Sequence, residues 1–183
     1  RALTAQNVAR IPEDRHAIGV IGELRIWENT ILERYHTAEF SRLGWLRRGQ
    51  ARRKAEAIVK DFDVRGLQAQ GLETTTRALS GGNMQKLILG RALTGTAGTP
   101  RLIIANQPTW GLDVGAVAFV HRQLLAAAEA GAAVIVISED LDELFALASD
   151  IAVMHAGRLS APRPAADWTM ADIGAAMAGV EAH

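Results

Sequence analysis

The sharpest chemical signal in the sequence is a serine followed by two glycines where a helical pattern begins. Ser80, Gly81 and Gly82 precede apolar residues at helical spacing, namely Met84, Leu87, Ile88 and Ala92. Ser80 is placed to cap such a helix, and two residues without side chains leave its first N–H groups uncovered. Because these groups lie at the positive end of the helix dipole, they are suited to bind a phosphate. The same three residues, taken alone, also fit an ordinary capped helix.

The second half of the chain contains the elements that would position this turn. Short apolar runs alternate there with helical stretches, a pattern typical of parallel strands joined by crossover helices. We predict strands over 102–105, 133–137 and 151–154, helices over 115–129, 140–149 and 170–177, and a turn over 156–158. The run over 133–137 is almost entirely apolar, so we expect that strand to be buried on both faces.

The first half has a different character, because it concentrates Arg, Glu and Trp and shows helical spacing. We predict helices over 27–35 and 51–62, with a loop over 43–45 between them. The predicted organisation has three parts: a helical part over 1–95, an α/β part over 96–160, and a tail over 161–183.

Composition excludes several classes of protein. The 183 residues include 20 basic and 20 acidic side chains, which argues against binding of nucleic acid or of an anionic membrane by bulk charge and leaves only local patches open. The absence of cysteine excludes disulfides, thiolate metal sites and a cysteine nucleophile, and it fits a cytoplasmic chain. No apolar run approaches the roughly 18–20 residues that span a bilayer. The first residues contain neither an initiator Met nor a signal-peptide core, so we expect a piece of a longer polypeptide.

Five ordered motifs resemble those of ABC-type ATPases. Residues 79–86, Leu-Ser-Gly-Gly-Asn-Met-Gln-Lys, resemble the signature motif in the form usual for the second nucleotide-binding domain of sugar-type uptake transporters. Residues 102–109 resemble the Walker B strand, 111–116 the D-loop, 134–140 the strand before the switch histidine, and 11–15 the Pro-Glu-Asp-Arg string at the Q-loop. The resemblance covers roughly residues 8–160. It implies a P-loop NTPase-like α/β fold, with a mostly parallel sheet and a helical signature subdomain.

One motif of that family is absent from the sequence. A phosphate-binding loop needs Gly-Lys-Ser/Thr, and the lysines here, at 54, 60 and 86, follow Arg, Val and Gln. The resemblance puts this loop, with the first strand of the sheet, upstream of residue 1. We therefore expect the chain alone to hydrolyse no ATP and to bind no nucleotide tightly.

Three further departures affect the chemistry of the implied catalytic site. Asn106 stands at the position of the Walker B Asp, Gln107 at that of the general-base Glu, and Glu139 at that of the switch His. A neutral amide is a poor ligand for Mg²⁺ and cannot take a proton from water, and a carboxylate repels a γ-phosphate. We therefore expect no metal held at Asn106. The three departures together favour a naturally degenerate half over an engineered Gln107, which stays open.

The resemblance also implies roles for the residues that match the family. The signature residues of one half close over ATP that is held by the other half; they are Ser80, Gly81, Gly82, Asn83 and Gln85. Glu13 takes the Q-loop position, which couples nucleotide state to the membrane subunit, and Asp113 lies in the D-loop.

The implied assembly is an importer of simple sugars or nucleosides on the cytoplasmic face of the inner membrane. It contains a second nucleotide-binding domain and transmembrane permease subunits, uses ATP and Mg²⁺, and depends indirectly on a periplasmic or lipoprotein solute-binding protein. Two alternatives stay open, a non-transport ABC ATPase acting on nucleic acid or ribosomes and an inert interaction module. The sequence does not name the solute or the oligomeric state.

Two charged clusters have competing interpretations. The acidic residues Asp140, Asp142 and Glu143 suggest a metal site, although their spacing favours a helix cap. A basic run could contact phosphate or lipid headgroups, although a solvated helix face is the simpler interpretation; it comprises Arg47, Arg48, Arg52, Arg53 and Lys54. The histidines at 16, 36, 121, 155 and 183 show no metal-ligand spacing.

Overall fold

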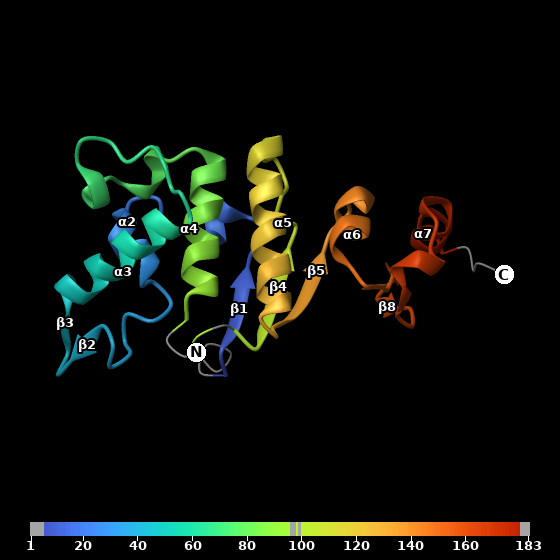
Figure 1. Ribbon diagram of the computed structural model, residues 1–183, viewed down its shortest axis with the longest axis horizontal. Coiled ribbons are helices and arrows are strands. Elements are labelled where there is room, and N and C mark those ends of the chain that lie inside the picture. Colours follow the sequence, from blue (N-terminus) through green and yellow to red (C-terminus); the bar gives the residue numbers. More distant parts are fainter. Residues whose placement is uncertain (1–5, 96–97, 99, 180–183) are drawn as a thin grey trace. The chain divides into compact units, whose positions relative to one another are not determined.

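The computed structural model describes residues 6–95, 98 and 100–179 (Figure 1). Its contacts divide the chain into two compact units, Arg1–Ile137 and Ser138–His183, and each is described by itself. The predicted three-part division stays a prediction, and residues 96 and 97 beside its first boundary lie outside the described part. None of the described helices is both long and apolar enough to cross a membrane.

The first unit is built on a three-stranded parallel sheet in the order β1-β4-β5. Its strands are β1 (Val8–Ile11), β4 (Leu102–Asn106) and β5 (Ala133–Ile137). Helix α5 (Val114–Glu129) connects β4 to β5 and ends before Gly131, whose φ of 95° suits a residue without a side chain. The strands predicted over 102–105 and 133–137 and the helix over 115–129 are confirmed.

Two sequence predictions for this sheet are wrong. β1 lies in the segment that was expected to be helical, because a strand of four residues is too short to show a reliable period. β5 was expected to be buried on both faces, yet Ile135 and Ile137 are 49% and 52% exposed. Among the described residues, β5 has a strand neighbour on one side, β4, and none on the other. An apolar run predicts a strand, but it does not reveal which neighbours cover it.

Within its described residues, the first unit contains three further helices besides α5. They are α2 (Ile26–Thr30), α3 (Arg48–Asp61) and α4 (Gly81–Leu93), with the short helical turns η1 (Arg15–Gly19), η2 (Gly71–Glu73) and η3 (Thr76–Ala78). The predicted helix over 27–35 is therefore shorter, and the one over 51–62 begins earlier. The predicted loop over 43–45 is the turn of a hairpin formed by β2 (Ser41–Arg42) and β3 (Trp45–Leu46). A small core lies between these elements, formed by Trp27, Ile31, Phe40, Ala51 and Ala55.

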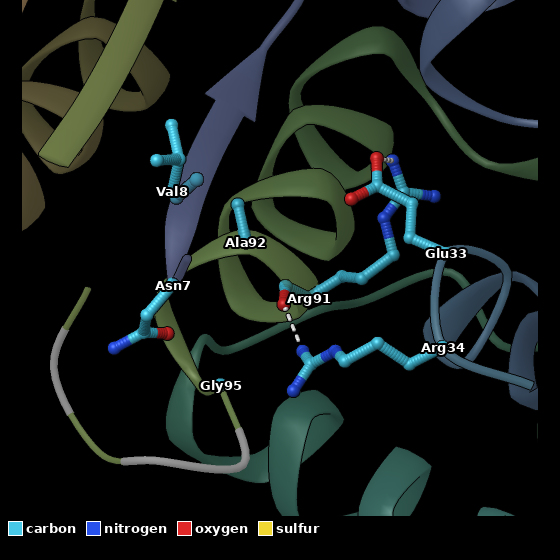
Figure 2. A pocket seen from close by; sticks show the side chains of 8 residues that line it. Asn7, Val8, Glu33, Arg34, Arg91, Ala92 and Gly95 are labelled. Carbon is cyan, nitrogen blue, oxygen red and sulfur yellow. Dashed lines mark hydrogen bonds and ion pairs between the residues drawn. The ribbon is translucent and has the colours of Figure 1, made fainter. Parts of the chain in front are cut away.

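Two buried arginines, Arg34 and Arg91, connect the carboxyl end of α4 to its surroundings by donating to backbone carbonyls (Figure 2). Arg34 donates to Arg91 O at 2.7 Å and to Thr94 O at 3.3 Å, while Arg91 donates to Gly19 O at 2.7 Å. Figure 2 shows Glu33 beside the Arg91 side chain, and their charged atoms lie 3.7 Å apart. Burial lowers the pKa of both guanidinium groups. These bonds fix the carboxyl end of α4 against the neighbouring segments of the chain.

The second unit is small and has its own core. Its helices are α6 (Leu141–Leu147), η4 (Ala165–Asp167) and α7 (Met170–Met177), and its core residues are Ile151, Val153, Trp168 and Ile173. The strand predicted over 151–154 is wrong as a single element. Instead β6 (Asp150–Ile151) pairs antiparallel with β9 (Arg163–Pro164), and β7 (Met154–His155) pairs with β8 (Arg158–Leu159). The predicted turn over 156–158 and the last helix are confirmed.

Candidate functional site

The serine–glycine turn forms the capped amino end of α4, as the sequence predicts. Ser80 Oγ accepts hydrogen bonds from Asn83 N at 3.4 Å and from Asn83 Nδ2 at 2.9 Å. Asn83 Oδ1 in turn accepts from Arg65 N at 2.7 Å. Within the described residues, the N–H groups of Gly81 and Gly82 have no hydrogen-bond acceptor. The turn therefore presents two open donors at the positive end of a helix of 13 residues.

Arg15 packs directly against this turn. Its guanidinium donates from Nη1 to Trp110 O at 2.7 Å and from Nη2 to Gly111 O at 3.3 Å. A Cβ placed on Gly81 would lie 3.2 Å from Arg15 Nε, so the absent side chain at 81 makes room for the guanidinium. Arg15 thus links the start of α4 to the loop that follows β4.

The backbone that carries Arg15 is held by the residue before it. Asp14 caps η1 by accepting hydrogen bonds from His16 N at 2.9 Å and Ala17 N at 2.8 Å. The bond from the Ala17 N–H, with that from His16, holds the pKa of the exposed Asp14 carboxyl below its usual value. Sequence reasoning assigned no role to Arg15. The only signal was its place in the Pro-Glu-Asp-Arg string.

Gln85 makes a second link between α4 and the loop after β4. Its side chain is 2% exposed, and Nε2 donates to Pro108 O at 2.7 Å. Since this amide is buried and already donates inside the chain, Gln85 supports the loop.

Gly82 allows α4 to approach the start of α5 closely. A Cβ on Gly82 would lie 3.2 Å from Ala116 Cβ and 3.5 Å from Asp113 Oδ2. Asp113 is itself the cap of α5 and accepts from Ala116 N at 2.9 Å. The structure therefore brings together the residues that we expect to form the signature and the D-loop, although they are about 30 residues apart in the sequence.

Glu13 and Asn106 form a second part of the candidate site, at the carboxyl ends of the adjacent strands β1 and β4. Asn106 Nδ2 donates to Glu13 Oε2 at 3.3 Å. This hydrogen bond depends on the amide of Asn106. An ionised Asp at position 106, as a metal ligand would be, has no hydrogen to donate to Glu13. The pair offers one exposed carboxylate.

Gln107 follows in a backbone conformation that is rare for residues with a side chain. Its φ is 47°, its N–H donates to Ile137 O at 2.8 Å, and its carbonyl accepts from Trp110 N at 3.2 Å. Such left-handed geometry stores local strain and is found disproportionately at functional sites. The side chain is a neutral amide, so this position can orient a water molecule but cannot deprotonate one.

Glu139 lies in the second unit, where its side chain is exposed. Asp140 beside it caps α6, accepting from Asp142 N at 3.0 Å and Glu143 N at 3.3 Å. This confirms the helix-cap interpretation of the acidic cluster. No group of three or more His, Asp and Glu side chains in the described part of the chain could hold a metal ion.

Comparison with known proteins identifies the family, although no protein-family profile matches the chain. Guanosine import ATP-binding protein NupO of Bacillus subtilis is 40% identical over 98% of this chain and 34% of its own length. Nucleoside import ATP-binding protein NupA of Lactococcus lactis is 37% identical, with the same shares covered. A solved ATP-binding cassette, MJ0796 in a dimeric post-hydrolysis state with ADP and phosphate, has a TM-score of 0.65 at 21% identity, covering 88% of this chain and 65% of that one. The chain belongs to the ABC-type ATPases.

The ABC-type fold confirms the predicted fold class, an α/β sheet accompanied by a helical part that carries the Ser80 turn. The chain spans about a third of the length of the curated ABC-type relatives that it matches. Glucose import ATP-binding protein TsgD13 of Haloferax volcanii, 36% identical over 98% of this chain and 32% of its own length, extends the set to a sugar importer.

Proposed function

We propose that this chain is part of the ATP-binding subunit of an ABC importer that couples ATP binding and hydrolysis to the uptake of simple sugars or nucleosides. The names of its relatives support this proposal, since they include guanosine, nucleoside and glucose import. The subunit works on the cytoplasmic face of the cell membrane. It binds transmembrane permease subunits and a second nucleotide-binding domain, and it depends on a solute-binding protein that delivers the solute.

The Ser80 turn supplies the signature half of a nucleotide site whose phosphate grip belongs to another domain. The observation that carries this proposal is the pair of open donors on Gly81 and Gly82. An anionic phosphate fits them, because it would satisfy both N–H groups and face the positive end of α4. When ATP is bound there, it supplies the phosphoanhydride bond whose hydrolysis drives import. Ser80, Gly81 and Gly82 would bind its terminal phosphate.

Three neighbouring residues hold that turn in place. Arg15 and Gln85 tie it to the loop after β4, and Asn83 holds the Ser80 hydroxyl. In this account Asn83 and Gln85 act as positioning residues. Asp113 caps α5 beside the turn and keeps the D-loop position within reach of it.

The chain's own catalytic positions are degenerate. Asn106 and Gln107 provide amides where Mg²⁺ binding and water activation need carboxylates, so these residues do not fit a magnesium ion. Glu139 is a further departure at the switch position. This half therefore activates the other nucleotide site and hydrolyses little ATP at its own.

Glu13 is proposed to couple nucleotide state to the permease. It is exposed at the end of β1, and its partner Asn106 ends the neighbouring strand. A shift of the β4 end would therefore be transmitted directly to an exposed carboxylate.

The proposal is tested by substituting Ser80→Arg in the assembled transporter and measuring ATP hydrolysis and solute uptake. A long cation at the cap would obstruct the phosphate approach, so we expect both rates to fall by on the order of 100-fold. Thr169→Arg is the matched control, because Thr169 caps α7 in the same way in the second unit. The control is expected to retain both activities, and full activity of Ser80→Arg would contradict the proposed role.

A second test concerns the nucleotide grip of the chain itself. Calorimetric titration of the 183-residue chain with Mg-ATP is expected to show no binding at micromolar concentrations, because the sequence contains no Gly-Lys-Ser/Thr string. Micromolar binding would contradict the assignment of the phosphate grip to another domain.

A further inference from the structure

The hairpin formed by β2 and β3 exposes large apolar side chains at its tip. Leu43 in the turn is 92% exposed, and Trp45 at the start of β3 is 81% exposed. Leu46 beside it is 38% exposed. The hairpin lies at the outer end of the helical part of the first unit, away from the sheet (Figure 1). We call Leu43, Trp45 and Leu46 the apolar tip.

Leucine is an unfavourable residue for the backbone conformation of this turn. Leu43 and Gly44 have φ values of 50° and 81°, the left-handed pair required by a two-residue hairpin turn. Asn-Gly is favoured at these positions, and a branched side chain at the first is unfavourable. Because the exposed Leu43 packs in no core, packing does not account for an unfavourable residue at this position, and this favours a functional role.

The apolar tip stands in a strongly basic segment of a chain whose formal net charge is zero. Residues 40–55 contain six basic side chains and no acidic one, whereas the whole chain has 20 of each. Arg42 is the cross-strand neighbour of Trp45, so both side chains lie on the same face of the hairpin. Arg42, Arg47 and Arg48 are exposed and form no ion pair or side-chain hydrogen bond with any described residue.

We propose that this hairpin binds the surface of a bilayer that contains anionic phospholipids. Arginine side chains pair with lipid phosphates, and a tryptophan ring prefers the boundary between headgroups and acyl chains. Leu43 can enter the acyl region. The hairpin is a direct lipid contact of the helical part, additional to any contact with a permease. It does not depend on the proposed transport function, since it rests on the exposure and charge of this hairpin alone.

The test is co-sedimentation of the full 183-residue chain with vesicles of phosphatidylcholine alone or with about a third phosphatidylglycerol. We expect binding to the anionic vesicles, weakening with salt, and little binding to the neutral ones. The double variant Leu43→Asn/Trp45→Thr should reduce the partition coefficient about tenfold or more. Asn suits the left-handed turn and Thr suits the strand, so both substitutions preserve the fold.

Two further variants separate lipid binding from misfolding. Arg47→Gln/Arg48→Gln should also reduce binding on the order of tenfold, without touching the turn. The matched control for the tip is Ala156→Asn/Leu159→Thr on the β7–β8 hairpin, whose turn has the same left-handed pair and where Leu159 is 63% exposed. The matched control for charge is Arg101→Gln/Arg158→Gln. Both controls should bind as the parent chain does.

Three results would overturn the proposal. The first is that the parent chain does not bind the anionic vesicles. The second is that Leu43→Asn/Trp45→Thr and its control Ala156→Asn/Leu159→Thr lose vesicle binding equally. The third is that the partition coefficient is unchanged in both Leu43→Asn/Trp45→Thr and Arg47→Gln/Arg48→Gln. The chain could also bind the permease in detergent without lipid. If Leu43→Asn/Trp45→Thr abolished that binding and left vesicle binding unchanged, the apolar tip would be a protein contact instead.

Discussion

The start of α4 and the end of β4 belong to the same unit, and they differ in what they are built to do. At the start of α4, two open backbone donors are surrounded by supporting contacts from Arg15, Gln85 and Asn83. At the end of β4, Asn106 and Gln107 are neutral amides, and Gln107 adopts strained backbone geometry. The start of α4 thus presents donors that suit an anion, whereas the amides of Asn106 and Gln107 cannot take a proton from water.

Helix α4 packs closely against α3 at Gly90, where a substitution should have the largest effect on stability. A Cβ on Gly90 would collide with Ile58 Cγ2 and lie 3.1 Å from Phe62 Cδ2. We expect Gly90→Ala to lower the free energy of unfolding of the first unit by about 1–3 kcal/mol, despite the better helix propensity of alanine. Denaturant unfolding measures it.

Gly174 in α7 is the control, because a Cβ there would meet nothing within 4 Å. Gly174→Ala should stabilise the second unit by about 0.5–1 kcal/mol. Stabilisation by both substitutions would contradict the close approach of α3 and α4.

Arg15 supports the turn directly, and its removal is the next largest effect. Arg15→Ala would remove two hydrogen bonds and leave the carbonyls of Trp110 and Gly111 without this donor. We expect a loss of about 1–2 kcal/mol in unfolding free energy, with faster amide exchange in the loop after β4. Arg101→Ala, at an exposed arginine, should change neither. Unchanged exchange in Arg15→Ala would show that the turn is held by other contacts.

A substitution that relieves the strained backbone at Gln107, just after β4, should raise stability, whereas the substitutions at Gly90 and Arg15 lower it. Gln107→Gly relieves the positive φ, so we expect the free energy of unfolding to rise by about 0.5–1 kcal/mol. Gln107→Ala keeps the strain and should give no such gain. Equal stability of the two variants would show that φ at this position costs nothing.

The smallest effect concerns the ion pair that joins the start of α4 to the end of α3. Asp63 accepts from Arg65 Nε at 2.9 Å and from Lys86 Nζ at 3.1 Å, and these bonds, Arg65 first, lower the pKa of the Asp63 carboxyl. A lowered folded-state pKa adds stability above the unfolded-state pKa, near 4, and this is lost as pH falls through the folded-state value.

Asp63→Asn should therefore reduce stability at pH 7 and leave it unchanged at a pH below the folded-state pKa. Asn suits the φ of 49° at this position, so the variant isolates the charge. Asp61→Asn, which removes an exposed carboxylate from the end of α3, is the control. A pH-independent loss in Asp63→Asn would point to geometry rather than ionisation.

The sequence predicted those elements whose pattern is long and regular. Helix α5 shows four turns of apolar spacing, and β4 is an apolar run of strand-forming residues, so both were found. β1 escaped because four residues carry too little pattern, and the exposure of β5 could not be known without its neighbours.

The candidate site was predicted as separate motifs, and its supporting contacts were not. The Ser80 cap follows from local chemistry and was predicted. The Asp113 cap follows from the same chemistry, but the sequence analysis placed Asp113 only in the D-loop. The links from Arg15 to Trp110 and from Gln85 to Pro108 join residues 95 and 23 positions apart, which no local pattern reveals. The left-handed backbone of Gln107 was equally invisible, since glutamine gives no signal for it.

The most direct test sets the two regions against each other in one assay, ATP hydrolysis by the assembled transporter that contains this chain. We expect Asn106→Ala/Gln107→Ala to keep the rate within about twofold, because no general base is lost, and Ser80→Arg to lower it on the order of 100-fold. A large loss in the amide variant with full activity in Ser80→Arg would contradict the account, because hydrolysis would then depend on the end of β4 and not on the start of α4.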